Sequence, residues 1–499
     1  MSFSLAEVHA LARAGAKEAA RAAFSAAGLD GVADDPAVLT LKGRLLKDAA
    51  DGASGAARAA LLGRAADAYA AAARLSPAAT YPLINAATLA LLSGAGRRAE
   101  QLARETLALL DGGAHEPDTP YWLGATRSEA LLLTGRETEA RAALRDAIAG
   151  SPEAWEDHAV TLRQFRRILD EQGRPAQWLE GFRPPPAVHF AGPIGVSPDD
   201  RALIAALDSA AATIGGGTAC GALAAGFDIL AAEALLRAGA RLQIVLPGPV
   251  DAFAAASVLP AGAAWLPRFE ALLAAALSVE TLDLPGPISA AAAVLAEEMA
   301  LGEAVRRARE RGSGAVALRA AGAASATPMG ERPGLRCVTV ACGANPAGGG
   351  ERLAPPARPM ALLGCHHGAA ERLAAVAGEA PVRITPAGAY VALADLAGAA
   401  AAALALFDAD SGAHPVLDYA VADAAGLADT AALDVLQAIP AQPYPVATRA
   451  ASLGLEARGA PFVTAPAGAG AALAGSVDFL SLWRAAGATP PDRRADGAN

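Results

Sequence analysis

The segment 215–247 constrains the fold of this chain most, because a strand-like run, a glycine turn, a helical run and a second strand-like run follow one another in it. An apolar run leads into Gly226, and apolar side chains then recur at helical spacing over 228–237, up to Gly239. A short apolar run bounded by proline, 242–246, follows. The order predicts strand, tight turn, helix and strand. Free N–H groups at the start of such a helix suit a phosphate or another anion, although many α/β folds bind nothing there.

The pattern along the chain predicts three domains of different classes. Residues 1–182 are helical in period, 184–322 alternate strands with helices, and 359–490 have an α+β, ferredoxin-like order. Residues 323–358, rich in Gly, Pro and Ala, are expected to form a linker with one strand, and 491–499 a tail. The expected architecture is therefore multidomain: an all-α helical repeat array, an α/β Rossmann-like parallel sheet and an α+β domain.

Composition narrows the classes of partner. The 499 residues carry a formal net charge of −10, which argues against a general nucleic-acid binder, and the only three lysines are Lys17, Lys42 and Lys47. The start of the chain lacks the pattern of a secretory signal, and no uncharged apolar run reaches the roughly 20 residues of a membrane span. Four cysteines in so long a chain do not predict a disulfide framework. We expect a cytoplasmic protein with no nucleic-acid and no membrane partner.

Weak internal repetition marks the helical region. The run LLSG at 91–94 recurs as LLTG at 132–135, and each run precedes an alanine-rich amphipathic helix. Helix pairs are expected to end near Pro77, Pro117 and Pro152, a spacing close to the roughly 34-residue tetratricopeptide period. The region resembles a tetratricopeptide array, which implies a concave face that binds a protein or peptide partner. Alternatively, the array only braces the next domain.

One stretch of this array, TYPLINAA at 80–87, contains a more specific likeness. Its residues 81–87 are similar to the repeat region beside the kinase domain in stress-activated MAP kinase kinase kinases. The resemblance implies a signalling context for the repeats.

Four motifs of the α/β region occur in the order of a known family. They are GFDILAAE at 226–233, VLP at 245–247, SV at 257–258 and WLPRFE at 265–270. Together they resemble the Rossmann-type domain of the SLOG superfamily, which contains DNA-processing and lysine-decarboxylase-like proteins. The order is most similar to the version that follows tetratricopeptide repeats in bacterial signalling proteins. The resemblance implies a nucleotide or nucleotide-derived ligand, and no other cofactor is expected.

Matching this family residue by residue gives a candidate ligand site. Gly226 would face the phosphate, and Asp228 would lie on the first helical turn. The loop at 192–195 would meet them, because ligands of parallel sheets lie outside the carboxyl ends of the strands. The candidate ligand-binding residues are Gly192, Gly195, Gly226, Asp228, Glu233 and Arg268.

The charged candidates also have purely structural interpretations. Asp228 could cap its helix, Glu233 could be a solvated helix residue, and Arg268 could pair with Glu270 on the surface. His189, which lies in an apolar strand, is expected to be a core histidine with satisfied hydrogen bonds rather than a catalytic base.

The order of elements in 359–490 is similar to a class III nucleotide cyclase domain. Residues 361–363 would match its first strand, 385–393 its central hairpin, and 446–453 the helix near its transition-state residues. Catalysis in that family needs two metal-binding aspartates, an asparagine and an arginine. The positions that match these four are Cys365, Ala387, Thr448 and Ser452.

These four residues imply a degenerate cyclase-like domain. A thiol at Cys365 and a methyl group at Ala387 cannot replace carboxylates toward magnesium, which prefers hard oxygen ligands. Because cyclase domains work as dimers, a pairing role could outlast the activity, and a homodimer is a further expectation. An unrelated α+β domain is the alternative.

The sequence thus favours a non-catalytic signalling or regulatory protein, in which repeats bind a protein partner and the SLOG-like domain senses a nucleotide-type ligand. No catalytic residue and no metal site is assigned, because the Cys and His residues at 337–367 lack a second tight pair and no G-x-S-x-G elbow occurs. Two alternatives remain open. One is an enzyme acting on nucleotides, either a hydrolase or a residual adenylate or guanylate cyclase, and the other is a structural scaffold.

Overall fold

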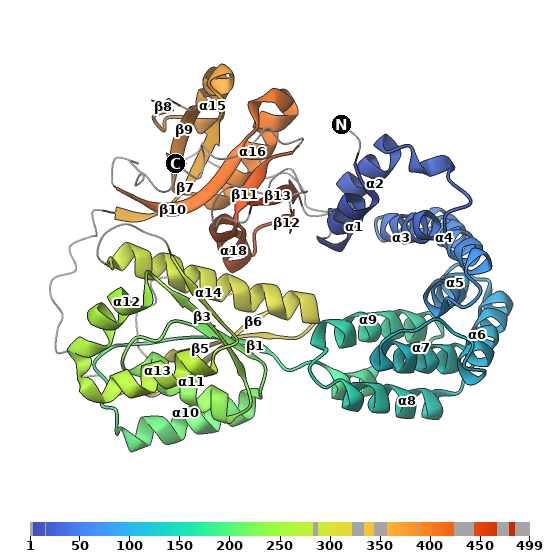
Figure 1. Ribbon diagram of the computed structural model, residues 1–499, viewed down its shortest axis with the longest axis horizontal. Coiled ribbons are helices and arrows are strands. Elements are labelled where there is room, and N and C mark those ends of the chain that lie inside the picture. The colour runs from blue at the N-terminus through green and yellow to red at the C-terminus, as the bar shows by residue number, and fades with distance from the viewer. Residues whose placement is uncertain are drawn as a thin grey trace. The chain divides into compact units, whose positions relative to one another are not determined.

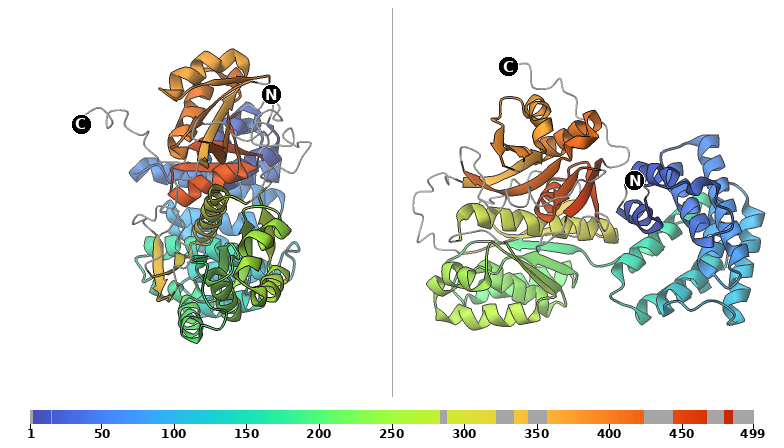
Figure 2. Two further views of the ribbon diagram at one scale, coloured as in Figure 1. Left: turned by 90° about the vertical axis from the view of Figure 1, so that its left-hand side faces the viewer. Right: turned by 45° about the horizontal axis from the view of Figure 1, so that its top comes forward.

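The computed structural model divides the chain into two compact units, residues 1–183 and 184–483, and each is described by itself (Figures 1 and 2). The structure describes residues 3–14, 16–282, 288–321, 334–343, 357–386, 388–423, 444–466 and 479–484.

The first unit is a curved array of helices, each packed on the next from α3 to α8 (Figure 1). Its helices are α1 (Leu5–Ala14), α2 (Lys17–Ala26), α3 (Pro36–Ala50), α4 (Gly55–Leu75), α5 (Thr80–Leu92), α6 (Gly96–Asp111), α7 (Pro120–Leu133), α8 (Glu137–Gly150) and α9 (Trp155–Glu171), with 3₁₀ turns η1 (Leu29–Gly31) and η2 (Gln177–Phe182). The predicted helical array is confirmed.

The two recurring motifs end equivalent helices. Gly94 after α5 and Gly135 after α7 have φ of 88° and 79°, in the region that glycine tolerates best. The next residue donates its N–H back over the helix end, from Ala95 to the carbonyl of Ala90 at 2.8 Å and from Arg136 to that of Leu131 at 2.9 Å. The repetition seen in the sequence therefore reflects a repeated structural unit.

The second unit begins with a six-stranded sheet in the order β4-β3-β2-β1-β5-β6, whose described strand pairs are all parallel. The strands are β1 (Ala187–Ala191), β2 (Thr218–Gly221), β3 (Arg241–Leu246), β4 (Ser278–Thr281), β5 (Ala315–Ala320) and β6 (Leu335–Val340). The connecting helices are α10 (Arg201–Ile214), α11 (Phe227–Arg237), α12 (Val250–Ser257), α13 (Leu266–Ala275) and α14 (Ala290–Arg311), with 3₁₀ turns η3 (Leu259–Ala261) and η4 (Ala263–Trp265). The predicted Rossmann-like parallel sheet is confirmed.

The two edge strands of this sheet relate to the sequence expectations in different ways. Strand β4 was not expected, because its four residues are mostly exposed and lack an apolar run. The one strand expected within the 323–358 linker is present as β6, but it pairs along its length with β5 and extends the parallel sheet. A short, exposed edge strand such as β4 buries little apolar surface, so its sequence carries a weak pattern.

A second, mixed sheet follows in the order β12-β13-β11-β10-β7-β9-β8. Its strands are β7 (Ala357–Cys365), β8 (Arg383–Thr385), β9 (Gly388–Leu393), β10 (Val416–Asp423), β11 (Val446–Thr448), β12 (Phe462–Pro466) and β13 (Phe479–Arg484), with helices α15 (Ala370–Ala377), α16 (Leu396–Ala409) and α18 (Arg449–Arg458) and 3₁₀ turns η5 (His367–Ala369) and η6 (Ser411–Ala413). Strand β10 pairs antiparallel with β7 and parallel with β11.

Helix α14 lies between the two sheets and belongs to both cores (Figure 1). Leu295 and Met299 of α14 share one buried cluster with Cys220 of β2 and Leu363 of β7. On the other face of the parallel sheet, a separate core is formed with α10, α11 and α13. Helix α14 therefore packs against both sheets of the second unit.

Candidate functional site

The glycine turn between β2 and α11 lies against the loop that follows β1. Gly226 has φ of 118°, and a Cβ there would lie 2.8 Å from the carbonyl oxygen of Pro193. Ile194 forms an isolated bridge with Gly226, and the N–H of Phe227 donates to the carbonyl of Pro193 at 3.2 Å. Two loops from the carboxyl ends of neighbouring strands are therefore in direct backbone contact, and one of the N–H groups at the start of α11 already has a partner.

Asp228 is the buried carboxylate of this junction. Its side chain is only 6% exposed, and its Oδ1 accepts a hydrogen bond from the N–H of Gly192 at 2.9 Å. Burial raises the pKa of Asp228 to about 7; the charge of Glu297 acts in the same direction, while the Gly192 N–H and Arg319 oppose it. A backbone hydrogen bond from Ala224 also lowers this pKa, so Asp228 contacts both the loop after β1 and the turn before α11.

Gly192 and Gly195 allow this arrangement in different ways. A Cβ at Gly192 would lie 2.3 Å from the Phe227 ring, so the chain passes directly over that ring. Gly195 has φ of 89°, which lets the loop turn away after its contact with Gly226. Every predicted glycine of the site thus lies at this junction.

Two charged residues that the sequence interpretation missed complete the junction. Arg319 of β5 and Glu297 of α14 form an ion pair at 2.7 Å, and both charges act on Asp228. Strand order reverses between β1 and β5, where crevices form in doubly wound sheets. An arginine within the otherwise apolar strand AVALRA was the available signal for Arg319.

His189 of β1 is buried as expected, but its hydrogen bonding differs from expectation. The residue is completely buried, but neither ring nitrogen has a hydrogen-bond partner in the part of the chain that the structure describes. Burial and the charge of Arg319 hold its pKa well below the ordinary value, so the imidazole is neutral. The expectation of a satisfied histidine was wrong, because residues paired with it across the sheet, Cys220 and Ala317, offer no acceptor or donor to replace water.

Glu233 and Arg268 bind each other rather than solvent or a surface neighbour. Arg268 Nε and Nη2 meet the Glu233 carboxylate at 2.7 and 2.5 Å, and Nη1 donates to the carbonyl of Pro198 at 2.8 Å. The guanidinium also stacks 5.0 Å from the ring centre of Trp265. The suggested Arg268–Glu270 pair is therefore incorrect, as is a solvated Glu233. The pair joins α11 and α13 to the chain after β1.

The described positions that were expected to match cyclase catalytic residues make structural contacts. Cys365 ends β7 beside Ala389 of β9, and burial raises its pKa to about 11, which keeps it a thiol. Thr448, the last residue of β11, caps α18: its hydroxyl accepts from the N–H of Ala451 at 3.2 Å and donates to Asp418 at 2.6 Å.

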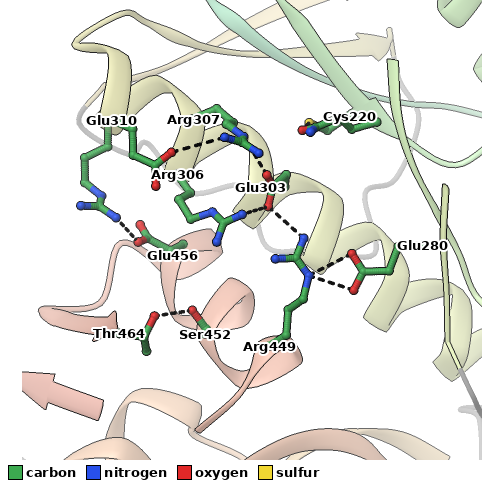
Figure 3. Close-up of polar contacts among 12 residues, drawn as sticks. Cys220, Glu280, Glu303, Arg306, Arg307, Glu310, Arg449, Ser452, Glu456 and Thr464 are labelled. Atoms are coloured by element: carbon green, nitrogen blue, oxygen red, sulfur yellow. Dashed lines mark hydrogen bonds and ion pairs between the residues drawn. The ribbon is translucent and has the colours of Figure 1, made fainter. Parts of the chain in front are cut away.

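Ser452 and Thr464 share a hydroxyl hydrogen bond of 2.7 Å (Figure 3). Ala387 lies outside the described residues. Within the described ranges, no group of three or more His, Cys, Asp or Glu side chains could hold a metal ion.

A network of ion pairs connects α14 to α18 (Figure 3). Glu303, buried on α14, meets Arg306 at 2.6 Å, Arg307 at 2.9 Å and Arg449 of α18 at 3.3 Å. Burial would raise the pKa of Glu303, but these guanidinium charges outweigh it and lower the pKa below the ordinary value. Arg449 also binds Glu280 at 3.0 Å, so α18 is held by carboxylates from two elements.

A second contact of α14 reaches the mixed sheet directly. Glu298 accepts from Tyr419 of β10 at 2.5 Å and from Arg458 of α18 at 3.0 Å. Glu298 follows Glu297, the partner of Arg319, in the sequence of α14. Adjacent residues of one helix therefore contact the junction at β1 and β5 and the second sheet.

Comparison with known families supports the interpretation of the first unit as a helical repeat region. The family model described as Tetratricopeptide Repeats-Sensor matches residues 3–90, which extend from α1 into α5. The expectation of a tetratricopeptide-like helical region is confirmed there. A search of curated proteins finds no match. Among the described residues, no helix has both the length and the apolar character needed to cross a membrane.

Proposed function

We propose that this chain is a non-catalytic signalling or regulatory protein that binds a nucleotide-type ligand between β1, β5 and α11. The observation that carries the proposal is the gathering of His189, Asp228, Glu297 and Arg319 where the strand order reverses. Burying titratable groups is costly, and their concentration at the expected crevice of a parallel sheet is typical of a ligand site.

The chemistry of this junction suits a nucleotide. Gly192, Gly195 and Gly226 let two backbone loops meet without side chains between them, and phosphate-binding loops use glycine in the same way. The Asp228 carboxyl is suited to accept a hydrogen bond from a ribose hydroxyl, and Arg319 to neutralise a phosphate. A SLOG-like assignment of this sheet agrees with both roles. Ligand entry requires that the 192–195 loop separate from Gly226, since the two are in contact.

The mixed sheet supports a degenerate cyclase-like domain. From β7 to β10 the chain runs β-α-β-β-α-β, and the neighbouring strands are β10-β7-β9-β8, all antiparallel, as a ferredoxin-like fold requires. At the aligned catalytic positions, Cys365 offers a thiol, and Thr448 and Ser452 offer hydroxyls already bound within the fold. We propose that this domain pairs two copies of the chain and receives the ligand signal through α14.

The helical repeats are proposed to bind a protein partner. The matching family is described as a sensor, and stacked helical repeats expose extended surfaces that commonly bind proteins. Tyr81 of α5 and Val160 of α9 are each 46% exposed, which is high for large apolar side chains. These two residues are candidate contacts for that partner.

Calorimetric titration of the full chain with ADP-ribose and with ATP tests the ligand site. We expect one of them to bind and Asp228→Asn to weaken it at least tenfold, since the amide keeps the shape but loses the charge. Asp251→Asn is the matched control, because Asp251 also lies in a first helical turn but is exposed. Absence of binding by both compounds, or equal effects of the two substitutions, contradicts the proposal.

An enzyme acting on nucleotides is the second candidate. The pKa of Asp228, about 7, is near the value that a general base needs at neutral pH. Product formation from ATP or GTP with Mg²⁺ or Mn²⁺, abolished by Asp228→Asn, would favour this candidate over a sensor. A purely structural junction instead predicts that Gly226→Val changes stability without changing any ligand response.

A further inference from the structure

A cluster of polar side chains from four helices gathers within the first unit. Glu129 of α7 accepts hydrogen bonds from Thr88 of α5 at 2.5 Å and from Gln164 of α9 at 3.1 Å. Lys47 of α3 is close enough for its charge to act on Glu129. Four helices, α3, α5, α7 and α9, therefore contribute side chains to one polar centre.

Basic residues outnumber acidic residues around this centre. Asp51 at the end of α3 binds Arg167 of α9 at 3.3 Å and Lys17 of α2 at 2.6 Å, and Arg44 lies 3.9 Å from Asp48. We call this centre the inner cluster. Its charged residues are five basic ones, Lys17, Arg44, Lys47, Arg163 and Arg167, and three acidic ones, Asp48, Asp51 and Glu129. This surplus stands out in a chain of net charge −10, two of whose three lysines lie here.

Lys47 is the group with most to gain from an anion. Its ammonium makes no hydrogen bond or ion pair with any described residue, while Arg167 and Arg44 act on it with like charge. Burial, followed by these charges, lowers the pKa of Lys47 against the opposing charges of Asp48 and Glu129. The pKa of Arg163 is lowered in the same way, by burial and by Arg167.

The Arg167–Asp51 ion pair limits what can occupy this place. It joins residues 116 apart in sequence, from the last long helix to the end of α3, beside the Thr88–Glu129–Gln164 hydrogen bonds. Because Asp51 already shares the Arg167 guanidinium, an occupant of this place must be an anion that can compete for it. A phosphate monoester carries a charge of about −1.5 to −2 at neutral pH, and basic groups in excess of acidic groups favour such an anion.

We propose that the inner cluster is a binding site for a small phosphate-bearing molecule. Lys47 and the guanidinium groups of Arg44 and Arg167 contact the phosphate, because ammonium and planar guanidinium groups are the strongest donors to its oxygens. Glu129, held by Thr88 and Gln164, accepts a hydrogen bond from a hydroxyl or amino group of the same molecule. The site is separate from the one proposed at β1 and β5, and neither depends on the other.

Calorimetric titration of the full chain with inorganic pyrophosphate tests this site. We expect binding in the millimolar range or tighter, weakened at least tenfold by Lys47→Gln. Lys42→Gln is the matched control, because Lys42 lies on the same helix but donates to the carbonyl of Asp30 at 2.6 Å. Arg167→Gln, verified as folded by circular dichroism, is expected to weaken binding as well. Equal affinity in Lys47→Gln and the unchanged chain overturns the inference.

Two further titrations distinguish this site from a general anion site and from the site proposed at β1 and β5. Citrate binding more tightly than pyrophosphate, with the same dependence on Lys47, would overturn phosphate as the ligand group. Asp228→Asn is expected to leave pyrophosphate binding by the first unit intact. If Asp228→Asn abolishes that binding and Lys47→Gln does not, the inner cluster is not the site and the proposal for β1 and β5 gains support. If neither variant changes it, the inner-cluster proposal fails independently of the other.

Discussion

Substitution of Gly302 by alanine tests the role of α14 as the helix that joins the two sheets. A Cβ at this position would lie 2.0 Å from the carbonyl oxygen of Leu453 in α18 and 2.7 Å from its carbonyl carbon. Both are backbone atoms, so no side-chain rotation relieves the overlap. Ordinary contact requires about 3.4 Å, and the two helices would have to separate by more than 1 Å.

The expected magnitude follows from two opposing effects. Overpacking a close-packed core costs about 1–3 kcal/mol, and backbone obstacles place this site at the upper end. Alanine is favoured over glycine in a helix by about 1 kcal/mol, which offsets part of the cost. We expect Gly302→Ala to lower the free energy of unfolding of the second unit by about 2 kcal/mol, with a larger loss for Gly302→Val.

Differential scanning calorimetry and urea unfolding of the full chain measure this loss. Gly63→Ala in α4 is the control, since the nearest atom to a Cβ there is the Cβ of Ser93 at 4.0 Å, and it should stabilise by about 1 kcal/mol. A Gly302→Ala chain at least as stable as the unchanged one, with Gly63→Ala behaving as stated, would refute the close α14–α18 packing.

Two further predictions concern buried titratable groups near β1. The folded-state pKa of Asp228 is raised to about 7, so between about pH 4 and 7 the folded chain keeps a proton that the unfolded chain releases, and stability falls as the pH rises. Asp228→Asn should remove this loss, which makes the variant up to about 4 kcal/mol more stable than the unchanged chain at pH 8 in urea unfolding. A stability difference that does not change with pH would contradict this prediction. The pKa of His189 is depressed and its ring nitrogens have no hydrogen-bond partner among the described residues, so the free energy of unfolding falls as the pH drops below about 6.5. His189→Leu should abolish that fall and add about 1–2 kcal/mol of stability at neutral pH. A destabilised His189→Leu variant would show instead that the imidazole has a partner or a role.

Local sequence patterns predicted the elements that position the candidate site. The turn at Gly226, the helix after it and the loop at 192–195 depend on glycine conformation and helical periodicity, both of which are local properties. The repeated LLSG and LLTG runs likewise specify their own helix ends. The expected ligand residues Gly192, Gly226 and Asp228 meet because parallel strands place their carboxyl ends at one edge.

Partners of charged side chains could not be predicted in this way. Glu233 and Arg268 are 35 residues apart, and each has a plausible surface role when considered alone. Arg319 meets Glu297 only because β5 lies next to β1 beneath α14. The missing partner of His189 also depends on which residues the neighbouring strands place beside it.

By itself, the sequence determined where helices, strands and glycine turns form, since these follow from the backbone preferences and apolar spacing of neighbouring residues. Only the tertiary structure decided that α14 packs against both sheets, that Lys47 lies without an ion-pair partner among the described residues of the inner cluster, and that Asp228 is buried. The physical reason is that burial and charge pairing depend on strand order and helix packing, which bring together residues separated by tens to more than a hundred positions.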